Sequence, residues 1–194
     1  MLPVIADLPP LQQERIVCSI SAAAKYEVPT NIVLAVAEKE GGKPGQRVKN
    51  SNGSQDVGVM QFNTTYLKDL KKYGITAEDV AGSGCYPYDL AAWRLRGHIR
   101  HDSGDLWTKA ANYHSRTPKY NAIYRSDLIK KAIKWADWLD EHFKTVDYST
   151  NSEFATATQT QPGKDNKRQD RAGEHFKFTP RTISYSYSGT NHDE

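Results

Sequence analysis

Residues 35–63 read AVAEKEGGKPGQRVKNSNGSQDVGVMQFN, and the pattern of this segment changes abruptly after Glu40. The residues before Glu40 continue an apolar run of helical period. Gly41 and Gly42 follow directly, and glycine readily adopts the left-handed conformation that ends helices. We therefore predict a helix over residues 30–40 that ends on an acid.

Helical phase indicates which acid of this helix turns inward. On a helical wheel, Glu40 falls between Val33 and Val36 on the apolar arc, whereas Glu38 falls on the other side and is expected to be solvated. Burial and the negative end of the helix dipole would both raise the pKa of the Glu40 carboxyl, as a general acid near neutrality requires. A frayed acid pointing into water is the alternative that residues 30–40 alone leave open.

The remainder of the chain is dominated by helical periodicity. Residues 43–63 lack a sustained period and are rich in Pro, Gly, Ser and Asn, which predicts a long loop or a small irregular hairpin. Loops of this length inside a compact domain are usually functional. Further helical segments are predicted over residues 11–26, 64–73, 76–79, 87–102, 105–115 and 121–144. The expected fold class is all-α or nearly so, with any sheet limited to the 43–63 loop.

Length and composition divide the chain into two parts. The 194 residues suffice for one domain and an appendage. Apolar residues recur at helical spacing up to about Thr145, whereas the following residues are mainly small, polar or charged. We predict one domain over residues 1–147 and a disordered tail over residues 148–194. The formal charge of +3 is a mild bias that an ordinary solvated surface explains.

Cysteines and histidines predict no metal site. Cys18 and Cys85 are compatible with one disulfide or with two separate thiols, and neither lies in a CxxC motif or at ligand spacing from a histidine. His98 and His101 share a helix face without an evident partner, so we expect both on the surface.

Several further features are expected to be structural. The start MLPVIADLPP shows no visible signal peptide, and no membrane-spanning segment is predicted. We predict one solvated helix face that carries Lys130, Lys131 and Lys134, and no nucleic-acid site. The chain has four tryptophans, and we expect most of them to lie in the core: Trp93, Trp107, Trp135 and Trp138.

Four separated motifs follow one another in a recognisable order. A helix-ending Glu40 precedes the loop NSNGSQDVG, which runs into GVMQFN at residues 58–63; AANYH at residues 110–114 and Tyr124 in the last helix come later. This order resembles the lysozyme-like lytic transglycosylases with an SLT domain, of the α+β lysozyme-like superfamily. Within them it is most similar to the small VirB1/IagB/TrbN-like enzymes of secretion and conjugation systems. The resemblance covers roughly residues 18–139.

The resemblance implies a peptidoglycan glycan strand as substrate and no cofactor. Glu40 would protonate the oxygen between N-acetylmuramic acid and N-acetylglucosamine and then act as a base, leaving a 1,6-anhydro product. The substrate's own acetamido group would stabilise the positive sugar centre, so no second carboxylate is required. The residues implied to bind substrate are Ser51, Gly58, Met60, Gln61, Asn63, Asn112, Tyr113, His114 and Tyr124.

Individual roles follow from the same resemblance. Gln61 and the backbone near Met60 would hydrogen-bond acetamido groups, Tyr113 would stack on a sugar or contact its hydroxyls, and Tyr124 would hydrogen-bond near Glu40. Packing roles stay open as alternatives for Met60 and Tyr113.

The resemblance also bears on location. Cys18 and Cys85 match the cysteine pair of the VirB1/IagB-like branch, which favours a disulfide and thereby an oxidising, periplasmic or other cell-envelope compartment. A tail with the aromatic patches HFKF and ISYSYS is hypothesised to recruit components of a secretion or conjugation apparatus.

Two departures and two alternatives accompany this interpretation. Gly41 stands where the family usually has Ser, and YHSR at residues 113–116 replaces the common YNAG. If Asp56 stood beside the cleaved bond, it would make the protein a hydrolysing lysozyme, although we favour a loop-shaping role for this residue. A non-enzymatic wall-binding or scaffold module is the alternative from another class.

Overall fold

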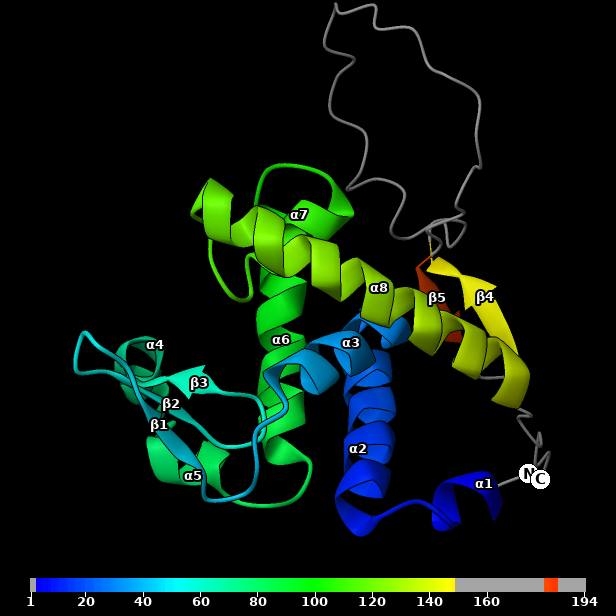
Figure 1. The fold of residues 1–194 in the computed structure, drawn as a ribbon, viewed down its shortest axis with the longest axis horizontal. Coiled ribbons are helices and arrows are strands. Elements are labelled where there is room, and N and C mark those ends of the chain that lie inside the picture. The colour runs from blue at the N-terminus through cyan, green and yellow to red at the C-terminus, as the bar shows by residue number, and fades with distance from the viewer. Residues whose placement is uncertain (1–2, 149–179, 185–194) are drawn as a thin grey trace, which may run out of the picture.

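The computed structural model describes residues 3–148 and 180–184, which form a helical domain with two small sheets (Figure 1). The helices are α1 (Pro3–Ala6), α2 (Pro10–Tyr26), α3 (Thr30–Glu40), α4 (Thr64–Leu70), the 3₁₀-helix η1 (Lys71–Tyr73), α5 (Ala77–Ala81), α6 (Tyr86–His101), α7 (Leu106–Ala111) and α8 (Pro118–His142). The strands are β1 (Arg47–Lys49), β2 (Gln55–Val57), β3 (Phe62–Asn63), β4 (Thr145–Asp147) and β5 (Arg181–Ile183). The predicted helical fold class is confirmed.

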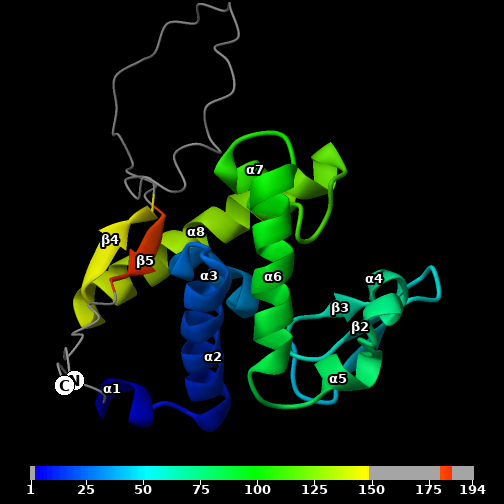
Figure 2. The same cartoon turned by 180° about the vertical axis from the view of Figure 1, so that it is seen from behind.

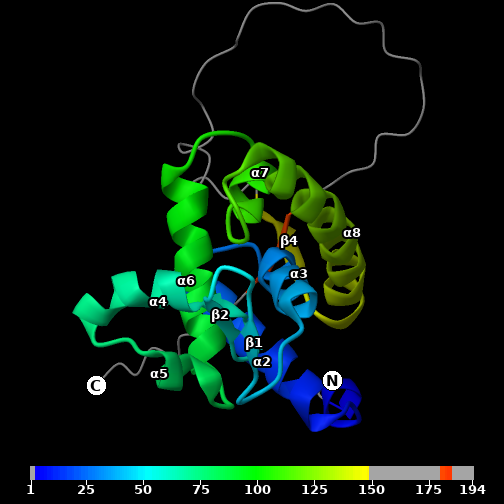
Figure 3. The ribbon, with the colours of Figure 1, turned by 60° about the vertical axis from the view of Figure 1, so that its left-hand side comes forward.

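Helix α3 forms the centre of the core. All of its residues from Thr30 to Ala37 are buried, and it packs against α2 and along α8. Gly41 ends the helix in the left-handed conformation, with φ of 56°, and donates its N–H to the Ala37 carbonyl. Figure 3 shows the end of α3 running directly into the segment that leads to β1. The carboxyl of Glu40 is therefore carried by a rigid, buried helix.

Helices α2 and α6 lie side by side in both Figure 1 and Figure 2. A disulfide joins Cys18 of α2 to Cys85, the residue before α6. At the other end of the pair, the Glu27 carboxylate accepts hydrogen bonds from Arg96 and Arg100, each at 3.0 Å. The disulfide favoured by the sequence resemblance is thus confirmed, and α6 is joined to α2 at its start and again near its end.

The segment between α3 and α4 contains a three-stranded antiparallel sheet in the order β1-β2-β3. The predicted small hairpin corresponds to β1 and β2, and β3 adds a third strand after the GVMQ turn. Buried Val57 and Phe62 are partners in the β2–β3 register and anchor the sheet to the core. In Figure 1 this sheet lies with α4 and α5 on one side of α6, whereas α2 and α3 lie on the other.

A second sheet corrects the predicted domain boundary. Strand β4 pairs antiparallel with β5, the Arg181 N–H donates to the buried Asn31 side chain, and the Tyr148 hydroxyl donates to the Glu27 carbonyl. The expected tail therefore does not begin at Tyr148, because hydrogen bonds attach Tyr148 and β5 to the domain. The sequence did not predict this contact, because β5 is polar and shows no apolar periodicity. HFKF and most of ISYSYS lie outside the described residues. Among the helices described, none combines the length and apolar character needed to cross a membrane.

The disulfide predicts a measurable loss of stability on its removal. Replacing Cys18 and Cys85 together by Ser removes a bridge between residues 67 positions apart, and loop-closure entropy then predicts a loss of about 4 kcal/mol in the free energy of unfolding. Urea unfolding of the wild type and the double variant measures this difference. Equal midpoints and slopes for the two proteins would show that the bridge contributes nothing.

Candidate active site

The Glu40 carboxyl meets the hydroxyl of Tyr124 where α8 crosses the end of α3. The Tyr124 hydroxyl donates to Glu40 Oε1 at 2.6 Å, and the Tyr124 side chain is otherwise buried. The two residues lie 84 positions apart, so the contact depends on the packing of α8 along α3. The inward direction predicted for Glu40 from helical phase is what the structure has.

Burial raises the pKa of the Glu40 carboxyl from its ordinary value of 4.5 to about 7. The hydrogen bond from Tyr124 and the positive charges of Lys39 and Arg94 act in the opposite direction, whereas the negative charge of Asp56 raises the pKa further. At neutral pH this carboxyl is therefore able both to give up and to take back a proton.

The ring of Tyr124 is held by two neighbours. The His114 imidazole stacks on it, with ring centroids 4.9 Å apart and an interplanar angle of 4°, and Lys39 Nζ lies 5.0 Å from the ring centroid. Lys39 is itself fixed by Asp127 of α8, whose Oδ2 lies 2.6 Å from Nζ. His114 is exposed, so its ring connects Tyr124 to the solvent-facing side of the site.

Glycines allow the GVMQ turn to approach the end of α3 closely. A Cβ on Gly42 would lie 2.1 Å from the Gly58 carbonyl oxygen, and one on Gly58 would lie 2.0 Å from the Val80 carbonyl oxygen. Gln61 has a positive φ of 47°, and its Nε2 donates to the Gly58 carbonyl at 2.7 Å. The turn thereby places the Gln61 side chain beside the residues that follow Glu40.

Met60 and Tyr113 support this turn from the core. Met60 is fully buried, and the Tyr113 hydroxyl donates to the Met60 carbonyl at 3.0 Å. The Tyr113 side chain is only 3% exposed, which leaves no ring face for stacking on a sugar. The structure therefore favours the packing alternative for both residues.

Both oxygens of the Asp56 carboxylate accept hydrogen bonds from asparagine side chains at the small sheet. Asn50 donates to one of its oxygens at 3.0 Å and Asn63 donates to the other at 2.8 Å. Asn63 also caps α4 by accepting the Thr65 N–H. These bonds agree with a loop-shaping role for Asp56. Ser51 lies in the turn between β1 and β2 and is exposed.

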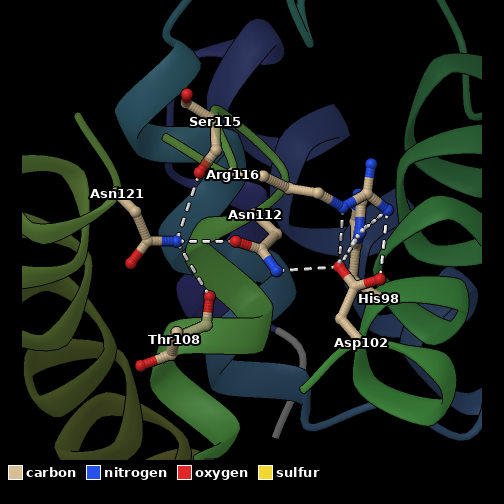
Figure 4. A network of polar contacts seen from close by, with 7 residues as sticks. All are labelled: His98, Asp102, Thr108, Asn112, Ser115, Arg116 and Asn121. Atoms are coloured by element: carbon tan, nitrogen blue, oxygen red, sulfur yellow. Dashed lines mark hydrogen bonds and ion pairs between the residues drawn. The ribbon is translucent and has the colours of Figure 1, made fainter. Parts of the chain in front are cut away.

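A buried polar network fixes the loop between α7 and α8 (Figure 4). Asp102 at the end of α6 accepts hydrogen bonds from Arg116 and Asn112 and pairs with His98 Nδ1 at 2.7 Å. The Asn121 amide of α8 donates in turn to Asn112 Oδ1 and to two backbone carbonyls. Because the loop carrying Tyr113 and His114 begins and ends in this network, the network positions both residues.

Charge and burial act against each other at Asp102. Burial would raise the pKa of this carboxyl, but hydrogen bonds from Arg116, Asn112 and His98 together lower it to about 2. Asp102 thus stays ionised under all ordinary conditions. The Arg116 that departs from the common YNAG sequence has a defined partner in this carboxylate.

A cavity of about 490 Å³ lies beside the network and does not include Glu40. Its lining residues are His101, Asp102, Ser103, Thr108, Asn112, Arg116, Pro118, Asn121, Ala122 and Arg125. This cavity and the carboxyl with the shifted pKa are therefore separate features.

Two residues expected to be solvated have partners that the sequence did not make evident. Glu38 accepts the Trp135 indole N–H at 2.7 Å and pairs with Lys131, because α8 covers this side of α3. His98 is only 7% exposed, because Asp102 four residues later supplies the partner that the sequence did not make evident. Among the tryptophans, Trp135 is buried and Trp107 and Trp138 pack against the core, whereas Trp93 is 43% exposed and is the exception.

Arg94 was not singled out by the sequence. Its guanidinium lies over the rings of Tyr66 and Tyr113, which reach it from α4 and from the end of α7. No local pattern predicts a contact among three residues from three separate segments. Its positive charge contributes to lowering the pKa of Glu40.

The helical core, the small sheet and the partly buried glutamate at a helix end define a lysozyme-like domain. A family profile described as Transglycosylase SLT domain matches residues 17–133, and the chain belongs to this family. The family comprises lytic transglycosylases, which are lyases of glycosidic bonds in peptidoglycan.

Two relatives support this assignment. Protein IpgF of Shigella flexneri is 29% identical over 124 residues, which are 61% of this chain and 81% of that protein. Invasion protein IagB of Salmonella typhimurium is 30% identical over 119 residues, which are 60% of this chain and 71% of that protein.

The shifted pKa of Glu40 predicts how stability depends on pH. Between pH 4.5 and 7 the folded protein holds a proton on Glu40 that the unfolded chain has released, so the free energy of unfolding falls as the pH rises. As the pH rises from 4.5 to 7, the Glu40 carboxyl lowers the free energy of unfolding by about 3 kcal/mol. Urea unfolding at a series of pH values should show that Glu40→Gln removes this fall. Parallel curves for the two proteins would contradict the shift.

Proposed function

We propose that this protein cleaves the β-1,4 bond between N-acetylmuramic acid and N-acetylglucosamine in peptidoglycan and leaves a 1,6-anhydro-N-acetylmuramic acid end. Glu40 is its single catalytic acid and base. The observation that carries this proposal is the partly buried Glu40 carboxyl, which accepts a hydrogen bond from Tyr124 and whose pKa is raised to about 7.

The first step requires a protonated carboxyl. Glu40 gives its proton to the glycosidic oxygen as the bond from that oxygen to C1 of N-acetylmuramic acid breaks. The substrate's 2-acetamido group stabilises the positive charge at C1, so the protein needs no nucleophilic carboxylate. The hydrogen bond from the Tyr124 hydroxyl favours the carboxylate that remains.

The second step returns the enzyme to its starting state. The Glu40 carboxylate takes the proton of the 6-hydroxyl as the oxygen of that group bonds to C1 and closes the anhydro ring. Glu40 is again protonated and no water is consumed. Glu40 can act first as the acid and then as the base because its pKa lies near neutrality.

Direct contacts with the glycan are assigned to the accessible residues. Gln61 uses its Nε2 on the Gly58 carbonyl, which leaves its carbonyl oxygen to accept an acetamido N–H. His114 offers an exposed ring edge beside Tyr124, and Ser51 and Asn63 lie on the sheet side of the site. The remaining residues implied by the resemblance, Gly58, Met60, Asn112 and Tyr113, shape the site from behind.

The contacts of Asp56 support a loop-shaping role, which favours the lyase over a hydrolytic lysozyme. One Asp56 oxygen accepts the Asn50 amide and the other accepts the Asn63 amide, so the carboxylate joins the segment after β1 to the end of β3. The alternatives of a hydrolase and of a non-enzymatic wall-binding module remain as distinguishable outcomes of the experiment below.

The proposed setting is the cell envelope. The disulfide between Cys18 and Cys85 suits the oxidising periplasm, where peptidoglycan is accessible. We propose that local opening of the wall serves a secretion or conjugation apparatus, and one relative is named an invasion protein. The catalytic unit in this proposal comprises residues 3–148 with strand β5, and the part of the chain after residue 148 outside β5 would recruit apparatus components.

Digestion of purified peptidoglycan tests the reaction directly. Mass spectrometry of the released fragments should find 1,6-anhydro ends, and Glu40→Gln should lower their formation at least about 100-fold because it removes the only proton donor. Glu38→Gln is the matched control on the same helix and should retain activity. Reducing ends with added water would indicate the hydrolase, and binding without cleavage by the wild type would indicate the non-enzymatic module.

A further inference from the structure

Arg94 is a cation enclosed by two tyrosines. Its guanidinium carbon lies 4.1 Å from the ring centroid of Tyr66 and 4.6 Å from that of Tyr113. The Phe62 ring packs near both tyrosines, with centroid separations of 6.2 and 6.3 Å. Because Tyr113 also bonds the Met60 carbonyl, Arg94 lies directly behind the turn that borders Glu40.

The charge of Arg94 has no carboxylate partner among the described residues. Its buried Nε also has no hydrogen-bond acceptor there. The other two arginines of α6, Arg96 and Arg100, both pair with Glu27 at 3.0 Å. A partly buried guanidinium without a counter-ion loses hydration that cation–π contacts replace only in part, so packing alone does not account for this arginine.

The field of Arg94 reaches the groups of the site. It lowers the pKa of Glu40 and opposes the rise in pKa that burial causes at Tyr113 and Tyr124. It also contributes, after burial, to the lowered pKa of His114. These shared effects indicate one positive centre facing one cluster of titratable groups.

Other charges face Glu40 from the surrounding elements. Lys39 of α3 is positive and lowers the pKa of Glu40 more than Arg94 does, although its ammonium is paired with Asp127 at 2.6 Å. Asp56 of β2 is negative, and its charge favours the protonated form of Glu40. Arg94 is thus the positive group near Glu40 whose charge no neighbouring carboxylate offsets within the described chain.

We propose that Arg94 is a positioning residue of the reaction: held between Tyr66 and Tyr113, its guanidinium stabilises the Glu40 carboxylate that exists between the two proton transfers. This inference rests on the proposed function. No hydrogen bond or ion pair joins Arg94 to Glu40 within the described chain, so Arg94 acts on Glu40 through its charge alone. A carboxyl as buried as Glu40 would otherwise hold its proton too tightly to donate it readily.

Charge-removing variants of Arg94 test this inference with two independent readouts. In Arg94→Met and Arg94→Gln, the alkaline limb of the pH dependence of kcat/KM should move upward by roughly half a unit, because Glu40 keeps its proton to higher pH. The fall in the free energy of unfolding should likewise continue to a pH that is higher by the same amount. This fall is measured as the difference between each Arg94 variant and the same variant that also carries Glu40→Gln. Arg94→Lys, which keeps the charge, should shift less.

Arg96→Met is the matched control on the same helix, because it removes a charge that is paired with Glu27. It should leave both curves in place. Unshifted curves in both neutral Arg94 variants would overturn the inference, as would equal shifts in Arg96→Met. The unfolding curves do not depend on turnover, so absence of the anhydro product would refute the proposed function without deciding the effect of Arg94.

Discussion

The hydrogen bond from Tyr124 to Glu40 is the contact on which the site depends. It joins the end of α3 to α8 at 2.6 Å and gives a carboxyl in a desolvated position one strong partner. Burial alone would hold the proton on Glu40, and the tyrosine together with nearby positive charge brings the pKa back to about 7. The balance between desolvation and these opposing interactions allows one side chain to act in both directions of proton transfer.

The surrounding structure keeps that balance in place. Close backbone contacts at Gly42 and Gly58 set the GVMQ turn against the end of α3, and any side chain at either position would collide with a carbonyl oxygen. On the other side, the ionised Asp102 fixes the loop that carries His114 onto the Tyr124 ring. Rigid support of this kind is what an acid needs if its environment sets its pKa.

The sequence predicted what local periodicity and separated motifs encode. The bounds of α3, the inward phase of Glu40 and the approach of Tyr124 were all accessible, because one helix wheel and one family pattern contain them. The partners of Glu38 and the burial of His98 were not, because α8 and Asp102 supply the contacts through tertiary packing. Strand β5 was missed for a related reason: polar strands held by backbone hydrogen bonds leave little trace in hydropathy.

The titration of the Glu40 carboxyl tests the central claim most directly. Carbon-13 NMR of the protein labelled at glutamate side-chain carboxyls, with Glu40→Gln to assign the signal, measures this pKa in the free protein. The account predicts a midpoint at about 7. A midpoint near the ordinary value of 4.5 would show that Glu40 is an ionised, solvated acid, and the mechanism built on it would be wrong.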